Sequence, residues 1–119
     1  MPTLSQLDLS DREREAIEEF RRRIVEGLLG RVERIVLYGS KARGDWDQDS
    51  DVDLLVLVRG EWRDAQRLAS ALSVDRPLDL GVLISAKAIS VDHHQQMLRE
   101  GWPFYRAVEA EGVEVWRRS

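Results

Sequence analysis

The sequence predicts an α/β (α+β) fold in which helices pack on a small mixed β-sheet. Residues 34–38 and 51–58 are short runs of mostly apolar, often β-branched side chains, which is typical of strands buried on both faces. Residues 11–29 instead repeat apolar side chains at helical spacing between charged ones. Helical and extended segments of this kind follow one another along the chain, and this order favours the mixed class.

The first helix has a recognisable start and end. Ser10 followed by Glu13 is the signature of a capping box, in which each side chain satisfies a backbone N–H group of the other residue. The apolar positions behind it are Ile17, Phe20, Ile24 and Leu28. A helix over 11–29 that stops near Gly30 is therefore expected.

Two strands separated by a turn and a loop follow this helix. The strand at 34–38 ends abruptly at Gly39, and residues 40–44 are expected to form a short helical turn. Residues 45–50 are polar and form a loop. The second strand, 51–58, follows that loop.

The second half of the chain continues the alternation. Apolar periodicity and turn residues predict a helix at 62–72, a third strand at 78–84, a helix at 88–99, a helical segment at 103–111 and a last short strand at 113–116. No internal repeat or low-complexity segment interrupts this order.

Length and composition limit the class of protein. With 119 residues the chain fits one domain over 1–119, and its 43% hydrophobic and 34% charged shares are those of a soluble globular protein. No apolar run reaches the roughly 18–20 residues of a membrane helix, and no secretory signal is visible. The absence of cysteine excludes disulfides, thiolate zinc sites and cysteine nucleophiles. We therefore expect a cytoplasmic protein.

The charge balance argues against a general nucleic-acid binder. The 22 acidic residues outnumber the 18 Lys and Arg residues, for a net charge of −4, whereas such binders usually carry a basic surplus. Duplex DNA or RNA is therefore not expected as the main partner. A small anionic ligand held through a metal cation remains open.

Five aspartates stand at every second position in one short stretch of the chain. Asp45, Asp47 and Asp49 suit a solvated loop, since Asp favours turns. Asp51 and Asp53 are followed directly by the apolar residues of a buried strand. Because side chains alternate along a strand, these two carboxylates point to the same face, roughly 6–7 Å apart. The pair is costly unless a divalent cation bridges it, and Mg²⁺ or Mn²⁺ is the expected metal.

Two further features are candidates for the same site. Gly39 and Ser40 join a buried strand to a helical turn, and backbone N–H groups and a hydroxyl in this arrangement can hold a phosphate. Asp79 is a lone acid within the apolar pattern of the expected third strand, and it can complete a three-carboxylate cluster if that strand pairs with 51–58. The alternative is an edge-strand Asp79 that faces water.

The two histidines of the chain are adjacent. On a helix His93 and His94 point about 100° apart, so they cannot both face one metal ion. Surface positions are predicted for both.

A longer motif contains these candidates. It reads Gly39-Ser40-x-Ala42-Arg43-Gly44-x5-Ser50-Asp51-x-Asp53-Leu54. It resembles, without a gap, the motif of the minimal nucleotidyltransferases (MNT), in the DNA polymerase β-like nucleotidyltransferase superfamily. Asp79 resembles the third carboxylate of that family, and residues 103–113 are similar to its usual C-terminal segment. The resemblance covers about residues 15–116.

The resemblance implies a polymerase β-like nucleotidyltransferase fold and a role for each matching residue. Gly39 and Ser40 would hold the triphosphate of ATP. Asp51 and Asp53 would bind two Mg²⁺ ions, and Asp79 would be a metal ligand or help to activate the attacking hydroxyl. A two-metal site of this kind clamps the attacking and leaving oxygens of an in-line displacement. Arg43 would assist at the phosphates or, alternatively, form a structural salt bridge to an acidic loop residue.

The resemblance also implies a partner. Family members of this size resemble the antitoxin half of HEPN–MNT toxin–antitoxin pairs, which transfer AMP from ATP to a tyrosine of the HEPN protein. The leading hypothesis is therefore Mg²⁺-dependent adenylylation of a hydroxyl on a HEPN-type partner. Two alternatives stay open: an antitoxin that acts by contact without catalysis, and a small-molecule (antibiotic) nucleotidyltransferase subunit whose acceptor site forms in a homo-oligomer.

Overall fold

The computed structural model describes residues 1–44, 51–74 and 82–119. In chain order its elements are η1 (Leu4–Gln6), α1 (Asp11–Gly27), β1 (Val32–Tyr38), α2 (Ser40–Arg43), β2 (Val52–Val58), α3 (Arg63–Val74), β3 (Ile84–Ser90), α4 (Val91–Glu100), α5 (Pro103–Glu111) and β4 (Val113–Arg117). The predicted α/β class is confirmed. Within the described ranges, none of the helices is long and apolar enough to cross a membrane.

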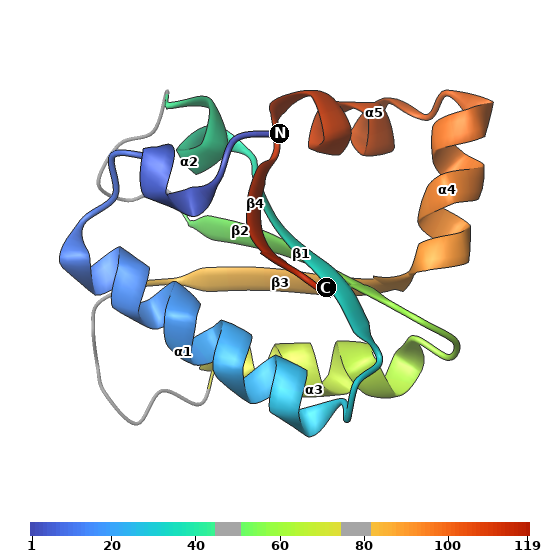
Figure 1. Cartoon of the computed structure of the whole chain (residues 1–119), viewed down its shortest axis with the longest axis horizontal. Coiled ribbons are helices and arrows are strands. Elements are labelled where there is room, and N and C mark those ends of the chain that lie inside the picture. The colour runs from blue at the N-terminus through green and yellow to red at the C-terminus, as the bar shows by residue number, and fades with distance from the viewer. Residues whose placement is uncertain (45–50, 75–81) are drawn as a thin grey trace.

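The four strands form one mixed sheet in the order β3-β2-β1-β4. Strand β1 is antiparallel to both β2 and β4, whereas β2 and β3 are parallel. A parallel pair needs a long crossover connection, and α3 lies within the one that joins β2 to β3. Figure 1 shows α1 and α3 on one side of the sheet and α4 and α5 on the other.

Both faces of the two central strands are buried. Ile35 and Leu37 belong to the larger core, which also contains residues of α1 and α3, whereas Val36 packs with Val108 of α5 in the smaller one. This burial explains why β1 and β2 read as nearly continuous apolar runs and not as alternating patterns.

The start of α1 has the predicted capping box. The Oγ atom of Ser10 accepts a hydrogen bond from the N–H group of Glu13 at 3.1 Å, and Oε1 of Glu13 accepts one from the N–H group of Ser10 at 2.9 Å. The helix ends at Gly27, two residues before the predicted end. Its first turn is therefore rigidly held, which matters below because Glu13 also contacts α2.

Strand β3 lies further along the chain than the third strand that the sequence predicts. The expected strand at 78–84 lies largely outside the described residues, and β3 instead occupies Ile84–Ser90. Its side chains alternate between the core, where Ala88 is buried, and the other face, where Lys87 is exposed. Alanine and lysine are depleted in strands, so this half-buried strand gives a weak signal. Helix α4 accordingly begins at Val91, with Ser90 as its N-cap.

Candidate active site

The predicted phosphate turn and the predicted carboxylate pair meet at one end of the sheet. Strand β1 ends at Tyr38, whose partner in β2 is Asp53. Gly39 and Ser40 come next in the chain, where α2 begins. On its other side Asp53 is paired with Ser85 of β3. The antiparallel register of β1 and β2 therefore brings Asp53 beside the turn.

Gly39 has a conformation and a neighbour that only glycine accommodates. Its φ is 77° and its ψ −157°, in the region that L side chains rarely adopt. A Cβ atom at this position would lie 2.5 Å from Oδ2 of Asp53. Because glycine has no side chain, the Asp53 carboxylate can pack directly against the backbone of the turn.

The Asp53 carboxylate is in an environment that favours its neutral form. Burial raises the pKa of Asp53 and the charge of Asp51 raises it further, although Lys87 and Arg43 act in the opposite direction. Asp51 is exposed and stands immediately before β2. Two acids that repel each other at the end of a buried strand are stabilised by a bound cation.

The donor set fits a hard divalent cation, although only two of its three predicted members are described. Asp51 and Asp53 supply carboxylate oxygens, which are the ligands that Mg²⁺ prefers. Asp79, together with Asp45 and the other loop aspartates, lies outside the described residues. Among the residues that the structure does describe, no group of three or more His, Cys, Asp or Glu side chains could hold a metal ion. The third carboxylate therefore stays a prediction.

Arg43 contacts an acid that the sequence did not point to. Its Nη1 atom lies 3.5 Å from Oε2 of Glu111, at the end of α5, and both side chains are exposed. Arg43 therefore makes a salt bridge to α5, whereas the acidic loop residues expected as its alternative partners lie outside the described residues. Arg43 also lowers the pKa of Asp53, so its charge acts at the carboxylate site as well.

Two side chains near Asp53, and an aromatic ring that contacts both of them, are absent from the sequence motif. Burial and the charge of Asp53 raise the pKa of Tyr38 to about 12. The Tyr38 ring packs edge-on against Phe104 with 5.4 Å between centroids, and Nζ of Lys87 lies 5.4 Å from the centre of the Phe104 ring. These residues come from β1, α5 and β3, and no local pattern in the sequence connects them.

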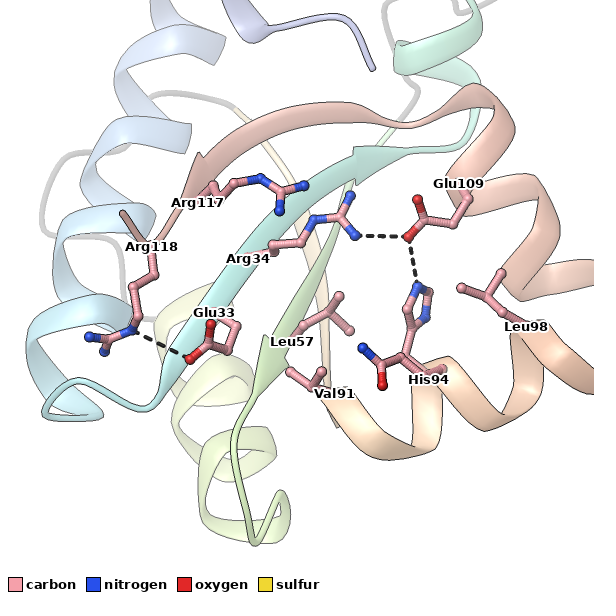
Figure 2. Close-up of a pocket in the computed structure, with 10 residues that line it drawn as sticks. Glu33, Arg34, Leu57, Val91, His94, Leu98, Glu109, Arg117 and Arg118 are labelled. Atoms are coloured by element: carbon pink, nitrogen blue, oxygen red, sulfur yellow. Dashed lines mark hydrogen bonds and ion pairs between the residues drawn. The ribbon is translucent and has the colours of Figure 1, made fainter.

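A second polar cluster lies on the same face of the sheet as α4 and α5, around a groove of about 570 Å³ (Figure 2). The surface position predicted for His94 is wrong, because His94 is only 2% exposed. Its Nε2 atom lies 2.9 Å from Oε1 of Glu109, which also accepts a hydrogen bond from Nη1 of Arg34 at 2.8 Å. Arg118 in turn lies 3.5 Å from Glu33. The two acids of this groove are each paired with an arginine, Glu109 with Arg34 and Glu33 with Arg118, and the candidate active site remains at Asp51 and Asp53.

Two relatives of known sequence are similar to this chain over most of its length. Putative protein adenylyltransferase MJ0141 of Methanocaldococcus jannaschii is 34% identical over 106 residues, which cover 85% of this chain and 96% of the relative. Putative protein adenylyltransferase MJ0604 of the same organism is 33% identical over 100 residues, 84% of this chain and 94% of the relative. Both matches extend over nearly the whole length of the relative.

Solved structures show the same fold. A putative nucleotidyltransferase from Sulfolobus solfataricus superimposes with a TM-score of 0.55 at 19% identity, over 92% of this chain and 91% of that one. A toxin–antitoxin structure with AMP-PNP gives a TM-score of 0.51 at 20% identity, over 86% of this chain and 74% of that one. The family model described as nucleotidyltransferase domain matches residues 14–99, a range that contains the turn and both described carboxylates. The chain therefore belongs to the nucleotidyltransferase domain family, as its motif indicates.

Proposed function

We propose that this protein transfers AMP from ATP to a hydroxyl group on a partner protein, with release of pyrophosphate, as the antitoxin of a HEPN–MNT pair, and that the reaction depends on Mg²⁺. The observation that carries the proposal is the close contact between the Gly39 turn and the Asp53 carboxylate. It puts the turn that we propose to bind phosphate beside a carboxylate that we propose to bind metal, an arrangement that would suit nucleotidyl transfer.

The acceptor class is supported by the relatives. Both Methanocaldococcus proteins carry the name protein adenylyltransferase, and the chain matches nearly their whole length. A toxin–antitoxin structure with AMP-PNP shares the fold. A protein acceptor and an adenine nucleotide donor are therefore the favoured pair, and the HEPN type of the acceptor rests on the resemblance of the motif.

Each residue of the site has a proposed task. The backbone of Gly39 and Ser40 would bind the triphosphate, with Arg43 as a further cation for its oxygens. Asp51 and Asp53 would hold Mg²⁺, whose charge would stabilise the attacking and leaving oxygens at the α-phosphorus. Asp79 would complete the carboxylate set and help to take the proton of the acceptor hydroxyl. Burial and the charge of Asp53 raise the pKa of Tyr38 and disfavour its phenolate, so Tyr38 would not act as the base.

The position of the label in ATP tests the reaction. The protein and a HEPN-type partner are incubated with Mg²⁺ and with ATP labelled at either the α- or the γ-phosphate. Adenylyl transfer moves only the α-label to the partner, whereas kinase activity would move only the γ-label. The label is expected to disappear in Asp51→Asn and Asp53→Asn and to persist in Asp92→Asn, an exposed acid in the first turn of α4.

The alternatives give different results. If the partner stays unlabelled and the double variant Asp51→Asn/Asp53→Asn still neutralises it, the protein acts by contact alone. If the α-label instead appears on a small molecule such as an aminoglycoside, the acceptor class is wrong while the nucleotidyl transfer stands.

A further inference from the structure

A buried lysine directly follows the phosphate turn. Lys41 is only 3% exposed, although an ammonium group is costly to bury without a partner. Its Nζ atom lies 2.5 Å from Oε2 of Glu13, which is buried in the first turn of α1. The pair links two elements, α1 and α2, that are far apart in the sequence.

Glu13 is a rigid partner because both of its carboxylate oxygens are engaged. Oε1 accepts the hydrogen bond from the N–H group of Ser10, and Oε2 contacts Lys41. Burial raises the pKa of Glu13, but the hydrogen bonds from Lys41 and Ser10 outweigh burial and hold the pKa below its usual value. The carboxylate is therefore ionised at neutral pH and fixed in place by the capping box.

Helix α2 needs such an anchor. It has four residues, and the N–H groups of Ala42 and Arg43 both donate to the carbonyl oxygen of Gly39 at 3.1 Å. A helix of this length is not stable by itself. Its place in the fold depends on contacts with the rest of the protein, and Lys41, next to Ser40, provides a buried one.

We propose that Glu13 and Lys41 are positioning residues for the nucleotide. Their ion pair fixes the turn at Gly39 and Ser40 against Asp53 and thereby sets the affinity for the triphosphate. The inference rests on the function proposed above for this turn. Both side chains are buried and bound to each other, so they act through the backbone of α2 and not by touching the substrate.

A double variant separates positioning from stability. Glu13→Gln keeps an acceptor for Ser10, and Lys41→Met keeps the length of the side chain. Each single variant is expected to lower Tm, because it removes one charge of a buried ion pair and keeps the other. In the double variant both charges are gone, and Tm is expected to return close to the wild-type value, since neutral residues often replace a buried ion pair without loss.

The effect on positioning is measured as the affinity for the nucleotide in the double variant, whose stability is expected to be close to that of the wild type. The dissociation constant for ATP with Mg²⁺ and the KM for ATP are expected to rise roughly 10-fold in the double variant, with kcat changed much less. The single variant Lys41→Arg keeps a cation at this position and should therefore keep most of the wild-type affinity for ATP. Ile24→Val, a core variant near the other end of α1, lowers stability without contact to the turn and should leave KM unchanged.

Amide hydrogen exchange gives a readout that is independent of the nucleotide. Residues 40–43 should exchange at least about 10-fold faster in the double variant, while β2 stays protected. A double variant with wild-type exchange at α2, or with wild-type affinity for ATP, would overturn the inference. If the wild-type protein binds no ATP, the proposed function fails, and the exchange rates at α2 alone decide whether the pair holds the turn.

Discussion

The carboxylate of Asp53 lies so close to the Cα atom of Gly39 that a Cβ atom there would be 2.5 Å from Oδ2. Gly39→Ala therefore has two costs, the unfavourable positive φ and the displacement of a carboxylate assigned to the metal. We expect a loss of about 1–3 kcal/mol in the free energy of unfolding and a loss of transfer activity of at least about 100-fold. Urea unfolding and the α-label assay measure the two effects.

Gly60 is the matched control for this substitution. Its φ is 78°, close to that of Gly39, but no atom lies within 4 Å of a Cβ built on it. Gly60→Ala should cost about 1–2 kcal/mol of stability from backbone strain alone and leave activity nearly unchanged. Equal losses of activity in the two variants would show that strain, and not the contact with Asp53, explains the effect at position 39.

Removing the charge of Asp53 should stabilise the metal-free protein. Burial and Asp51 raise the pKa of Asp53, so between the unfolded and folded pKa values the folded state binds more protons than the unfolded one. The free energy of unfolding attributable to Asp53 therefore falls as pH rises through that interval and stays low at pH 7. Asp53→Asn should raise Tm in EDTA by a few degrees.

Added Mg²⁺ should make the wild-type protein more stable than Asp53→Asn. The cation binds the folded wild-type protein and raises its Tm with concentration, whereas Asp53→Asn should respond weakly. The measurement is thermal unfolding at pH 7 with EDTA and then with increasing Mg²⁺. A wild-type Tm that is insensitive to Mg²⁺ and Mn²⁺ would remove the metal site from the proposal.

The sequence was sufficient to predict the elements that carry the motif. The apolar runs of β1 and β2 and the glycine between β1 and α2 leave a local signature, and their pairing follows once the strands are adjacent. The antiparallel register then places Asp53 beside Gly39. These features are short-range in sequence or fixed by strand alternation, which explains why the pattern alone identifies them.

The contacts around the site were not predictable in the same way. Lys41 looks like an ordinary surface residue of a polar turn, and only the fold shows that it is buried against Glu13. The packing of Tyr38 on Phe104 joins residues from β1 and α5. Likewise, the buried His94 of α4 contacts Glu109 of α5. Polar pairs made across the fold have no periodicity, so no window of the sequence contains their signal.

Two variants distinguish a role of Arg43 in binding the phosphates from a role in stabilising the fold. If the guanidinium binds the triphosphate, Arg43→Ala should raise the KM for ATP roughly 10-fold, whereas Glu111→Ala should leave KM unchanged or lower it by releasing Arg43. The Arg43–Glu111 pair is exposed and 3.5 Å long, so neither variant should cost more than about 0.5 kcal/mol of stability. Parallel increases of KM in both variants would instead assign the salt bridge itself to the positioning of α2.

Glu109 should contribute stability that is lost in acid. Burial raises its pKa, but hydrogen bonds from Arg34 and His94 outweigh burial and hold the pKa below its usual value. The contribution of the ionised carboxylate is therefore fully present above the pKa of an unfolded glutamate and disappears as pH falls through the lower, folded value. Glu109→Ala leaves both donors without this acceptor and should cost about 1–3 kcal/mol at pH 7.

The pH dependence distinguishes this charge effect from a loss of packing. Urea unfolding of the wild type and of Glu109→Gln, measured from pH 7 downward, should give a difference in free energy that shrinks once the wild-type carboxylate is protonated. Glu111→Gln, an exposed acid two residues further along α5, is the control and should differ little from the wild type at any pH. A difference for Glu109→Gln that stays constant across the whole range would mean that shape, and not the ionised carboxylate, holds Arg34 and His94 in place.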